Sequence, residues 1–244
     1  MRKLFLLGIL FFISLTAMAQ IGGKHVYSFL NLPHGPRQAA LGGKIITLYD
    51  YDSSGGVLNP ASINKEMHKQ VSLNYTSYFA DVNYGTVAYA RQIKDTEHVI
   101  HAGVHYINYG SFDGYDEGGT YTGTFSGGDV AISFGYAYQI PNTDLHIGTN
   151  AKFISSKLED YTSFGIAADI GLMYLLPETN YRFALVAKNM GTQLKAYHET
   201  YESLPFELMI GVSNELENLP LRWHVTLDQL QKWNISYSNP NRAE

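Results

Sequence analysis

The amino-acid sequence predicts an all-β fold, a transmembrane antiparallel β-barrel of the outer-membrane type. Three observations predict it: an N-terminal stretch with the pattern of an export signal, long segments of alternating character, and an unusual composition. Only 16% of the 244 residues are charged, whereas 14% are aromatic, including 19 Tyr. Alternation of apolar with small or polar residues places an apolar stripe on one face of each strand. Few charges and many aromatic rings suit a surface that meets lipid.

The first 19 residues predict a cleavable signal peptide. Arg2 and Lys3 precede an apolar run over residues 4–15, and the stretch ends in the small-x-small sequence AMA. A permanent membrane helix is disfavoured because the run is shorter than the ~20 residues that cross hydrocarbon. We therefore expect export, with a mature chain that starts at Gln20.

Composition excludes several classes of protein. The chain has no cysteine, which removes disulfide scaffolds, thiol catalysis, cysteine-based metal sites and the acylated cysteine of a lipoprotein. Its net charge of -5, without a basic cluster, argues against a nucleic-acid partner. Export without disulfides or a lipid anchor favours the outer membrane of a Gram-negative bacterium.

Residues 20–62 are expected to form a compact plug, or hatch, inside the barrel. Their central stretch, FLNLPHGPRQAALGG at 29–43, contains proline and glycine that interrupt both helix and strand. Its apolar side chains, such as Phe29 and Leu30, would be unusual in a solvated leader, which is the alternative. The residues that define this plug motif are Pro33, Pro36, Arg37, Leu41, Gly42, Gly43, Asn59 and Pro60.

Residues 63–244 predict the barrel itself. Alternation is clearest over residues 145–153 and 164–174, where large apolar residues occupy one face and small or polar residues the other. Several segments approach the ~9–11 residues that a tilted strand needs to cross a membrane. About ten strands are expected: 71–79, 82–91, 98–109, 129–139, 144–157, 161–175, 181–189, 206–214, 221–228 and 233–238.

Connection lengths predict an orientation. The long gaps, 110–128 and 190–205, share one side of the sheet, and the tight turns IPNTD and PETN share the other. Outer-membrane barrels have long loops outside and short turns in the periplasm, so the first strand would start in the periplasm. A soluble β-sandwich also alternates, but long strands with tyrosines near their ends favour the barrel.

Several stretches resemble a known family. FLNLPHGPRQAALGG, then Asp50, then Asn59 and Pro60 in GGVLNPASI, and later AKNMGTQL and LPFELMIGVS, resemble the FadL-like outer-membrane barrels, most closely the PorV/PorQ branch of the type IX secretion system. The resemblance implies roughly fourteen strands with an N-terminal hatch in the lumen. The C-terminus departs from it, because SNPNRAE lacks a terminal aromatic residue and about ten strands are too few. We therefore expect the barrel to be incomplete at this end.

The resemblance also implies a non-enzymatic function. Such a protein would anchor a surface partner, PorZ, in the attachment complex with PorU and PorV, which links cargo to lipopolysaccharide in the outer membrane. The alternatives are a FadL-like transporter of hydrophobic small molecules and a soluble secreted binding protein. Candidate partner-binding residues in the expected external loops are Phe112, Asp113, Tyr115, Asp116, Tyr121 and Tyr197.

No pattern predicts a catalytic, cofactor or metal site. The G-x-S-x-G, H-E-x-x-H and G-x-x-x-x-G-K motifs are absent. His101 and His105 share a strand face but lie about 13 Å apart, too far to share an ion, and His98 faces the other way. The acidic residues near position 116 lack a calcium-loop pattern. Asp169, on the expected lumen face, is either a channel carboxylate or a hydrogen-bonded structural partner.

Overall fold

The computed structural model describes residues 25–94 and 96–232. These residues form one nine-stranded antiparallel sheet in which every strand pairs with the next along the chain. The all-β, antiparallel expectation is confirmed. The expected signal peptide and the expected strand at 233–238 lie outside the described residues. The strands are β1 (Val71–Ser77), β2 (Asn83–Gln92), β3 (His98–Tyr115), β4 (Tyr121–Gln139), β5 (Leu145–Leu158), β6 (Tyr161–Leu176), β7 (Tyr181–Lys195), β8 (Glu207–Glu215) and β9 (Arg222–Leu227).

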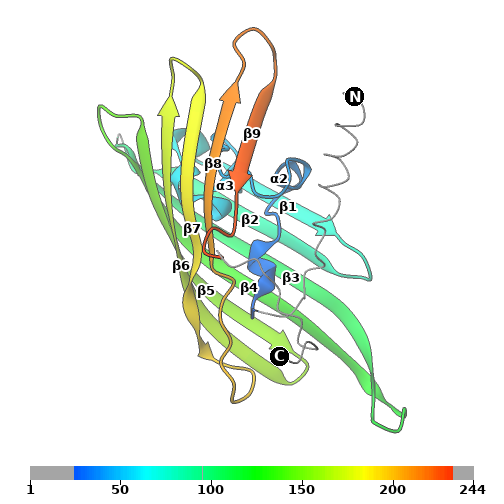
Figure 1. The fold of residues 1–244 in the computed structure, drawn as a ribbon. Coiled ribbons are helices and arrows are strands. Elements are labelled where there is room, and N and C mark those ends of the chain that lie inside the picture. The colour runs from blue at the N-terminus through cyan, green and yellow to red at the C-terminus, as the bar shows by residue number, and fades with distance from the viewer. Residues whose placement is uncertain (1–24, 95, 233–244) are drawn as a thin grey trace, which may run out of the picture.

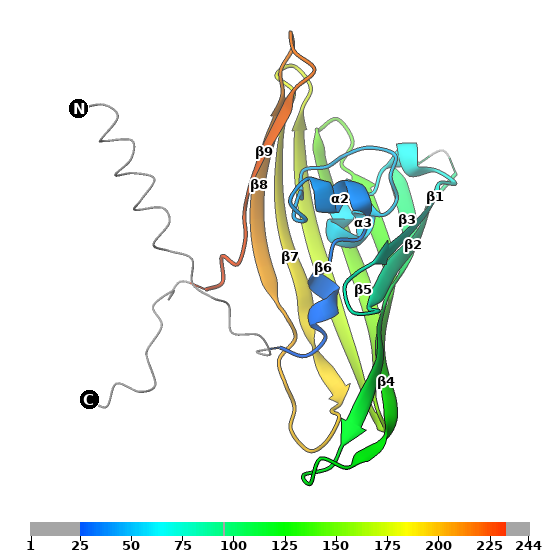
Figure 2. The same ribbon diagram turned by 90° about the vertical axis from the view of Figure 1, so that its right-hand side faces the viewer.

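The sheet is strongly curved, with β1 and β9 at its two edges (Figures 1 and 2). Its hollow side holds the chain that precedes β1, which we call the N-terminal segment (residues 25–70). This segment contains only short helices: η1 (Ser28–Asn31), α2 (Pro36–Ala40), α3 (Gly55–Leu58), η2 (Pro60–Ser62) and η3 (Lys65–Met67). Within the described ranges, no helix is long and apolar enough to cross a membrane.

The longest strands correct one expectation. Residues 110–128 were expected to form a loop, but β3 continues to Tyr115 and β4 begins at Tyr121. Phe112 lies opposite Phe125 in the extended ladder, after a register shift between Asn108 and Ser111. Only residues 116–120 connect the two strands. We call residues 109–127 the long hairpin; it projects past the neighbouring strand ends (Figure 2).

Strand β7 also runs further than expected. It was predicted to end at residue 189, but it reaches Lys195. Asn189 takes a left-handed conformation with φ of 57°, and the pairing with β6 shifts register between Ala168 and Ile170. This bulge, a feature that bends a strand and redirects its side chains, lies beside Asp169.

The two faces of the sheet differ in chemistry. Strand residues alternate between buried and exposed along most of β2 to β8. Phe153, Ile166 and Ile170 share the convex, exposed face, and Ile147 is half-buried on the same face. Other large apolar residues exposed there include Leu73, Val87, Tyr89, Ile100, Val104, Ile132, Phe134, Tyr136, Leu172, Tyr174, Phe183, Leu185, Ile210, Trp223 and Val225. The concave face is covered by the N-terminal segment.

Three apolar clusters hold the N-terminal segment in place. The first joins Phe29 and Leu30 of η1 to Ile107 and Ile154 of the sheet. The second joins Ile46 and Leu58 to side chains of β6, β7 and β8, among them Met173. The third joins Ile63 and Met67 to side chains of β2, β3 and β4. Burial of such side chains is the main favourable term in packing. Side chains of the N-terminal segment are therefore packed against the concave face of the sheet.

Candidate functional site: the seat of the N-terminal segment and the long hairpin

Glycines in the middle of the sheet let the N-terminal segment lie directly on the backbone. A Cβ atom at Gly148 would lie 2.2 Å from the carbonyl oxygen of Pro60, and one at Gly171 would lie 2.3 Å from Oδ1 of Asn59. Both distances are impossible for real atoms, so these positions require glycine for the close approach. Asn59 and Pro60 therefore lie directly against β5 and β6.

Asn59 holds its own turn by two hydrogen bonds. Its side-chain amide donates to the carbonyl of Ile46 at 2.7 Å, and its Oδ1 accepts the N–H of Ala61 at 2.9 Å. The side chain is buried, so both polar atoms need these partners. Pro60 then starts η2 at a position where no backbone N–H is required. This local geometry explains why the sequence pattern is Asn-Pro.

Four polar side chains beneath this turn form what we call the polar seat: Asn150, Lys152, Asp169 and Asn189. Lys152 Nζ lies 2.7 Å from Oδ2 of Asp169 and donates to Oδ1 of Asn189 at 2.9 Å. The backbone N–H of Asn189 donates to Asp169 Oδ1 at 2.8 Å. All four are buried. The carboxylate is therefore a hydrogen-bonded structural partner, the second of the two readings of Asp169.

The polar seat contacts the N-terminal segment at two points. Asn150 Nδ2 donates to the carbonyl of Gly56 at 2.9 Å, and Asn189 Nδ2 lies 3.1 Å from Oδ1 of Asn31. The two contacts lie at different helices of the segment, α3 and η1. Because a buried donor without a partner is costly, each contact favours the seated position.

A pair of histidines links the segment to β3. His105 Nε2 lies 3.2 Å from the carbonyl oxygen of Phe29, so it carries the proton there and Nδ1 is an acceptor. His105 Nδ1 lies 2.8 Å from the hydroxyl of Thr86, which donates to it, and 3.1 Å from Nδ1 of His34. Burial, followed by the nearby His105 and Lys188, lowers the pKa of His34 well below its usual value. His34 is therefore neutral when seated, and its Nε2 has no partner within the described residues.

The rest of the plug motif shapes the outer part of the segment. Pro36 begins α2 and Arg37 pairs with Asp50. Gly42 and Gly43 have φ of 88° and 80°, in the left-handed region that favours glycine. Lys44 forms ion pairs with Glu207 of β8 and with Asp228. Pro33 contacts this turn, and Leu41 is half-buried beside it.

Most of the candidate partner-binding residues lie on the long hairpin. Phe112 stacks on Phe125 with ring centroids 5.4 Å apart, and Tyr115 meets Tyr121 edge to face at 5.8 Å. Phe112, Tyr115 and Tyr121 are exposed, and so is Asp113. The carboxylate of Asp116 accepts the N–H groups of Gly118 and Thr120, at 2.9 and 2.8 Å, and so closes the tip. Asp116 thus has a structural task of its own.

Tyr197 lies in the connection between β7 and β8, where its side chain packs inward. It is half-buried against the first apolar cluster, and its hydroxyl bonds to Ser156. Burial raises the pKa of Tyr197 to about 12, so the phenol stays protonated at neutral pH. Ser156 also donates to Asp129, whose other oxygen accepts from Tyr109 at 2.6 Å. Tyr197 is therefore a packing residue of the β7–β8 connection.

Sequence reasoning missed the polar seat as a unit. Its early signals were that Asn150 and Lys152 fall on the face opposite the large apolar residues and that Asp169 lies on the expected lumen face. The expected opposite facing of His98 is confirmed: it stacks on Tyr138 on the convex side, whereas His101 and His105 are buried on the concave side. Over the described residues, no group of acidic, histidine or cysteine side chains is arranged to hold a metal ion.

Comparison with known proteins leaves the family open. No protein-family model matches the chain, and a search of curated proteins found no significant match.

Proposed function

We propose that this chain is a non-enzymatic outer-membrane β-barrel protein that holds a surface partner through the long hairpin. The observation that carries the proposal is the contrast between the two faces of the sheet. Large apolar side chains are exposed along the convex side of almost every strand, whereas the concave side carries buried charges. A water-soluble protein would bury its apolar face, but a barrel wall turns that face to lipid.

The position of the N-terminal segment supports the proposal that the barrel lumen is closed. In the proposed barrel, it would act as a hatch, seated by the polar seat and by the close approach at Gly148 and Gly171. The wall behind it carries Lys152, Asp169 and a buried Lys188. Because passages for hydrophobic molecules are lined mainly by apolar side chains, these charges favour the holding role over transport.

The long hairpin supports the choice of contact surface. It projects past its neighbours (Figure 2) and exposes Phe112, Tyr115 and Tyr121. Exposed aromatic side chains are enriched where proteins bind partners. Following the resemblance of the sequence to the PorV/PorQ branch, we propose the role of PorQ: the hairpin would hold PorZ, and the complex with PorU and PorV would attach cargo to lipopolysaccharide.

Shortening the long hairpin tests this proposal. Replacing residues 113–124 by Asn-Gly rejoins the paired positions Phe112 and Phe125 with a two-residue turn. In cells, this variant should assemble in the outer membrane, release PorZ into the medium and stop cargo attachment. A full-length control carries Thr122→Ser, which keeps the aromatic residues, and should retain PorZ.

A third variant separates the two functions. Asp169→Leu disturbs the hatch and leaves the hairpin intact, so PorZ should remain at the surface wherever this variant assembles. Retention of PorZ by the shortened hairpin, together with loss of cell function in an assembled Asp169→Leu protein, would favour transport and overturn the holding role.

A further inference from the structure

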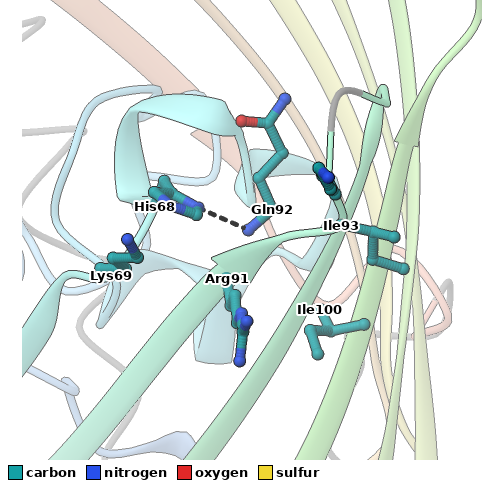
Figure 3. A pocket seen from close by; sticks show the side chains of 7 residues that line it. His68, Lys69, Arg91, Gln92, Ile93 and Ile100 are labelled. Atoms are coloured by element: carbon teal, nitrogen blue, oxygen red, sulfur yellow. Dashed lines mark hydrogen bonds between the residues drawn. The ribbon is translucent and has the colours of Figure 1, made fainter.

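A basic hollow lies at the end of the sheet where β2 turns into β3. It has a volume of about 540 Å³ and is lined by His68, Lys69, Arg91, Gln92, Ile93, Lys94 and Ile100. Figure 3 shows that Arg91 and Ile100 project from neighbouring strands to the same side, whereas Gln92 points to the other. A hollow of this size is in the range that binds small ligands, ~300–1,000 Å³.

Backbone pairing fixes the cations around the hollow. The N–H of Lys69 donates to the carbonyl of Ala90 at 2.9 Å, which holds residue 69 beside the end of β2. Lys69 has φ of 61°, a conformation that non-glycine residues rarely adopt. A residue held in such an uncommon conformation motivates a functional hypothesis. Glycine would suit this conformation better, but it would leave the hollow without the Lys69 side chain.

His68 adds a hydrogen-bond donor. Its Nδ1 accepts the backbone N–H of Gln92 at 3.1 Å (Figure 3). In the neutral ring, the proton must then be on Nε2, which leaves that atom as a donor. The hollow thus combines three side-chain cations with a histidine N–H, a set suited to the oxygens of a phosphate.

Acidic groups nearby do not neutralise this set. Glu97 pairs with Lys65 at 2.8 Å, and no ion pair joins Lys69, Arg91 or Lys94 to a carboxylate within the described ranges, which exclude Asp95. All three cations are exposed. Among the described residues, the positive charge of Lys69 and Arg91 is therefore available to an anion.

The hollow borders the apolar convex face. Arg91 lies opposite Ile100 in the β2–β3 ladder, and the next outward residue of β2 is Tyr89. Ile93 and Ile100 are themselves exposed. The long hairpin lies at the other end of β3, so in the proposed orientation the hollow lies at the periplasmic edge of the membrane. Cations above an apolar surface match a charged headgroup above its acyl chains.

We propose that this hollow binds the phosphate of an anionic glycerophospholipid in the periplasmic leaflet. The proposal rests on the proposed membrane location of the convex face. Lys69 and Arg91 contact the phosphate oxygens, His68 donates through Nε2, and Ile93 and Ile100 contact the first part of an acyl chain.

Binding of defined lipids to the full chain tests this. The protein in non-ionic detergent micelles is titrated with phosphatidylglycerol, with phosphatidylcholine of the same acyl chains, or with inorganic phosphate, and bound lipid is counted by native mass spectrometry. The wild type should retain one phosphatidylglycerol. The double variant Lys69→Gln/Arg91→Gln should bind it about 30-fold more weakly, because each cation near an anionic lipid surface contributes roughly fivefold.

Matched variants distinguish the effect of charge at this hollow on lipid affinity from the effect of charge elsewhere on the protein. Lys157→Gln/Lys195→Gln removes two exposed lysines at the opposite end of the sheet and should leave the affinity unchanged. Lys69→Arg/Arg91→Lys keeps both charges and should bind within a few-fold of the wild type.

Several outcomes overturn the proposal: equal affinity in the wild type and the Gln double variant, equal retention of phosphatidylcholine, or displacement of phosphatidylglycerol by inorganic phosphate. If the Gln double variant does not fold, comparing the binding of the three ligands to the wild type still tests the proposal. Insertion into vesicles is measured separately: failure to insert contradicts the outer-membrane proposal, whereas insertion without selective lipid retention contradicts only the lipid site.

Discussion

The ammonium of Lys152 on β5 lies 2.7 Å from the carboxylate of Asp169 on β6, and both side chains are buried beneath the N-terminal segment. The same carboxylate accepts the N–H of Asn189 at the bulge of β7. One ion pair thus connects three neighbouring strands under the turn at Asn59 and Pro60. Asn150 and Asn189, which lie next to this pair, contact the N-terminal segment at Gly56 and Asn31.

Removing one member of this ion pair should be more damaging than removing both. Asp169→Leu leaves Lys152 as an unpaired buried charge, which typically costs about 3–5 kcal/mol of folding free energy. In Lys152→Met/Asp169→Leu neither charge remains, so the loss should be smaller than that of Asp169→Leu alone. Urea unfolding of the purified chain in lipid vesicles measures both. Additive losses in the double variant would show that the two side chains do not interact.

Adding a methyl group at Gly148 should displace the N-terminal segment. In Gly148→Ala the new Cβ would overlap the carbonyl of Pro60, and forced overpacking typically costs about 1–3 kcal/mol. Limited proteolysis should then cut the segment near residues 37–43 sooner than in the wild type. Gly55→Ala is the control, because its Cβ would meet nothing closer than 3.6 Å. Equal cutting of all three proteins would contradict the close approach.

Charge on the convex face should destabilise the membrane-folded protein in a depth-dependent way. Ile170→Arg, in the middle of β6, should cost about 2–4 kcal/mol on folding into lipid vesicles, whereas Tyr174→Arg, on the same face near the end of β6, should cost about 0–1 kcal/mol. Both side chains are exposed, so loss of packing is similar. A penalty independent of position would indicate that this face does not meet hydrocarbon. Gly165 is an unsuitable lumen control, because a Cβ there would lie 2.6 Å from the Tyr27 ring.

Acid should loosen the N-terminal segment through His34. Its pKa in the folded state is lowered by burial and by His105, Lys188, Lys152 and His101. The unfolded chain takes up a proton near pH 6.5 while the folded chain does not. Stability is therefore complete above about pH 6.5 and falls as the pH drops below it.

The histidine prediction is measured by protease cutting of the segment at pH 7.5 and pH 5. Cutting should increase at pH 5 in the wild type and less so in His34→Gln. His198→Gln, which changes an exposed histidine, should behave as the wild type does. If the wild type and both variants respond equally to acid, the response belongs to a titratable group other than His34.

Alternation in the sequence was enough to predict the nine described strands and their faces, because a period of two is a property of the backbone. It failed where glycine is frequent. Residues 110–128 were expected to form a loop, yet Gly114 and Gly123 lie opposite each other in the β3–β4 ladder, since pairing between two long strands outweighs the low strand propensity of glycine. The extension of β7 was missed for a similar reason at Gly191.

The candidate site was harder to predict than the strands. Proline and glycine indicated a bent segment, and its apolar residues indicated packing. Its partners were not visible, because they depend on register: Lys152 reaches Asp169 only because Asn150 lies opposite Asp169 in the β5–β6 ladder. The inward packing of Tyr197 was not visible either, because a loop position alone does not show which way a side chain points.

The contacts of the N-terminal segment also determine an order of assembly. The Asn150 contact to Gly56 spans 94 residues, the Asn189 contact to Asn31 spans 158, and the Lys44 contact to Glu207 spans 163. Contacts between residues so distant in sequence form late, because closing the intervening chain costs entropy first. The N-terminal segment, which is synthesised before the strands that hold it, can therefore reach its final position only after β5 to β8 have paired, so it remains exposed to proteases and chaperones until then.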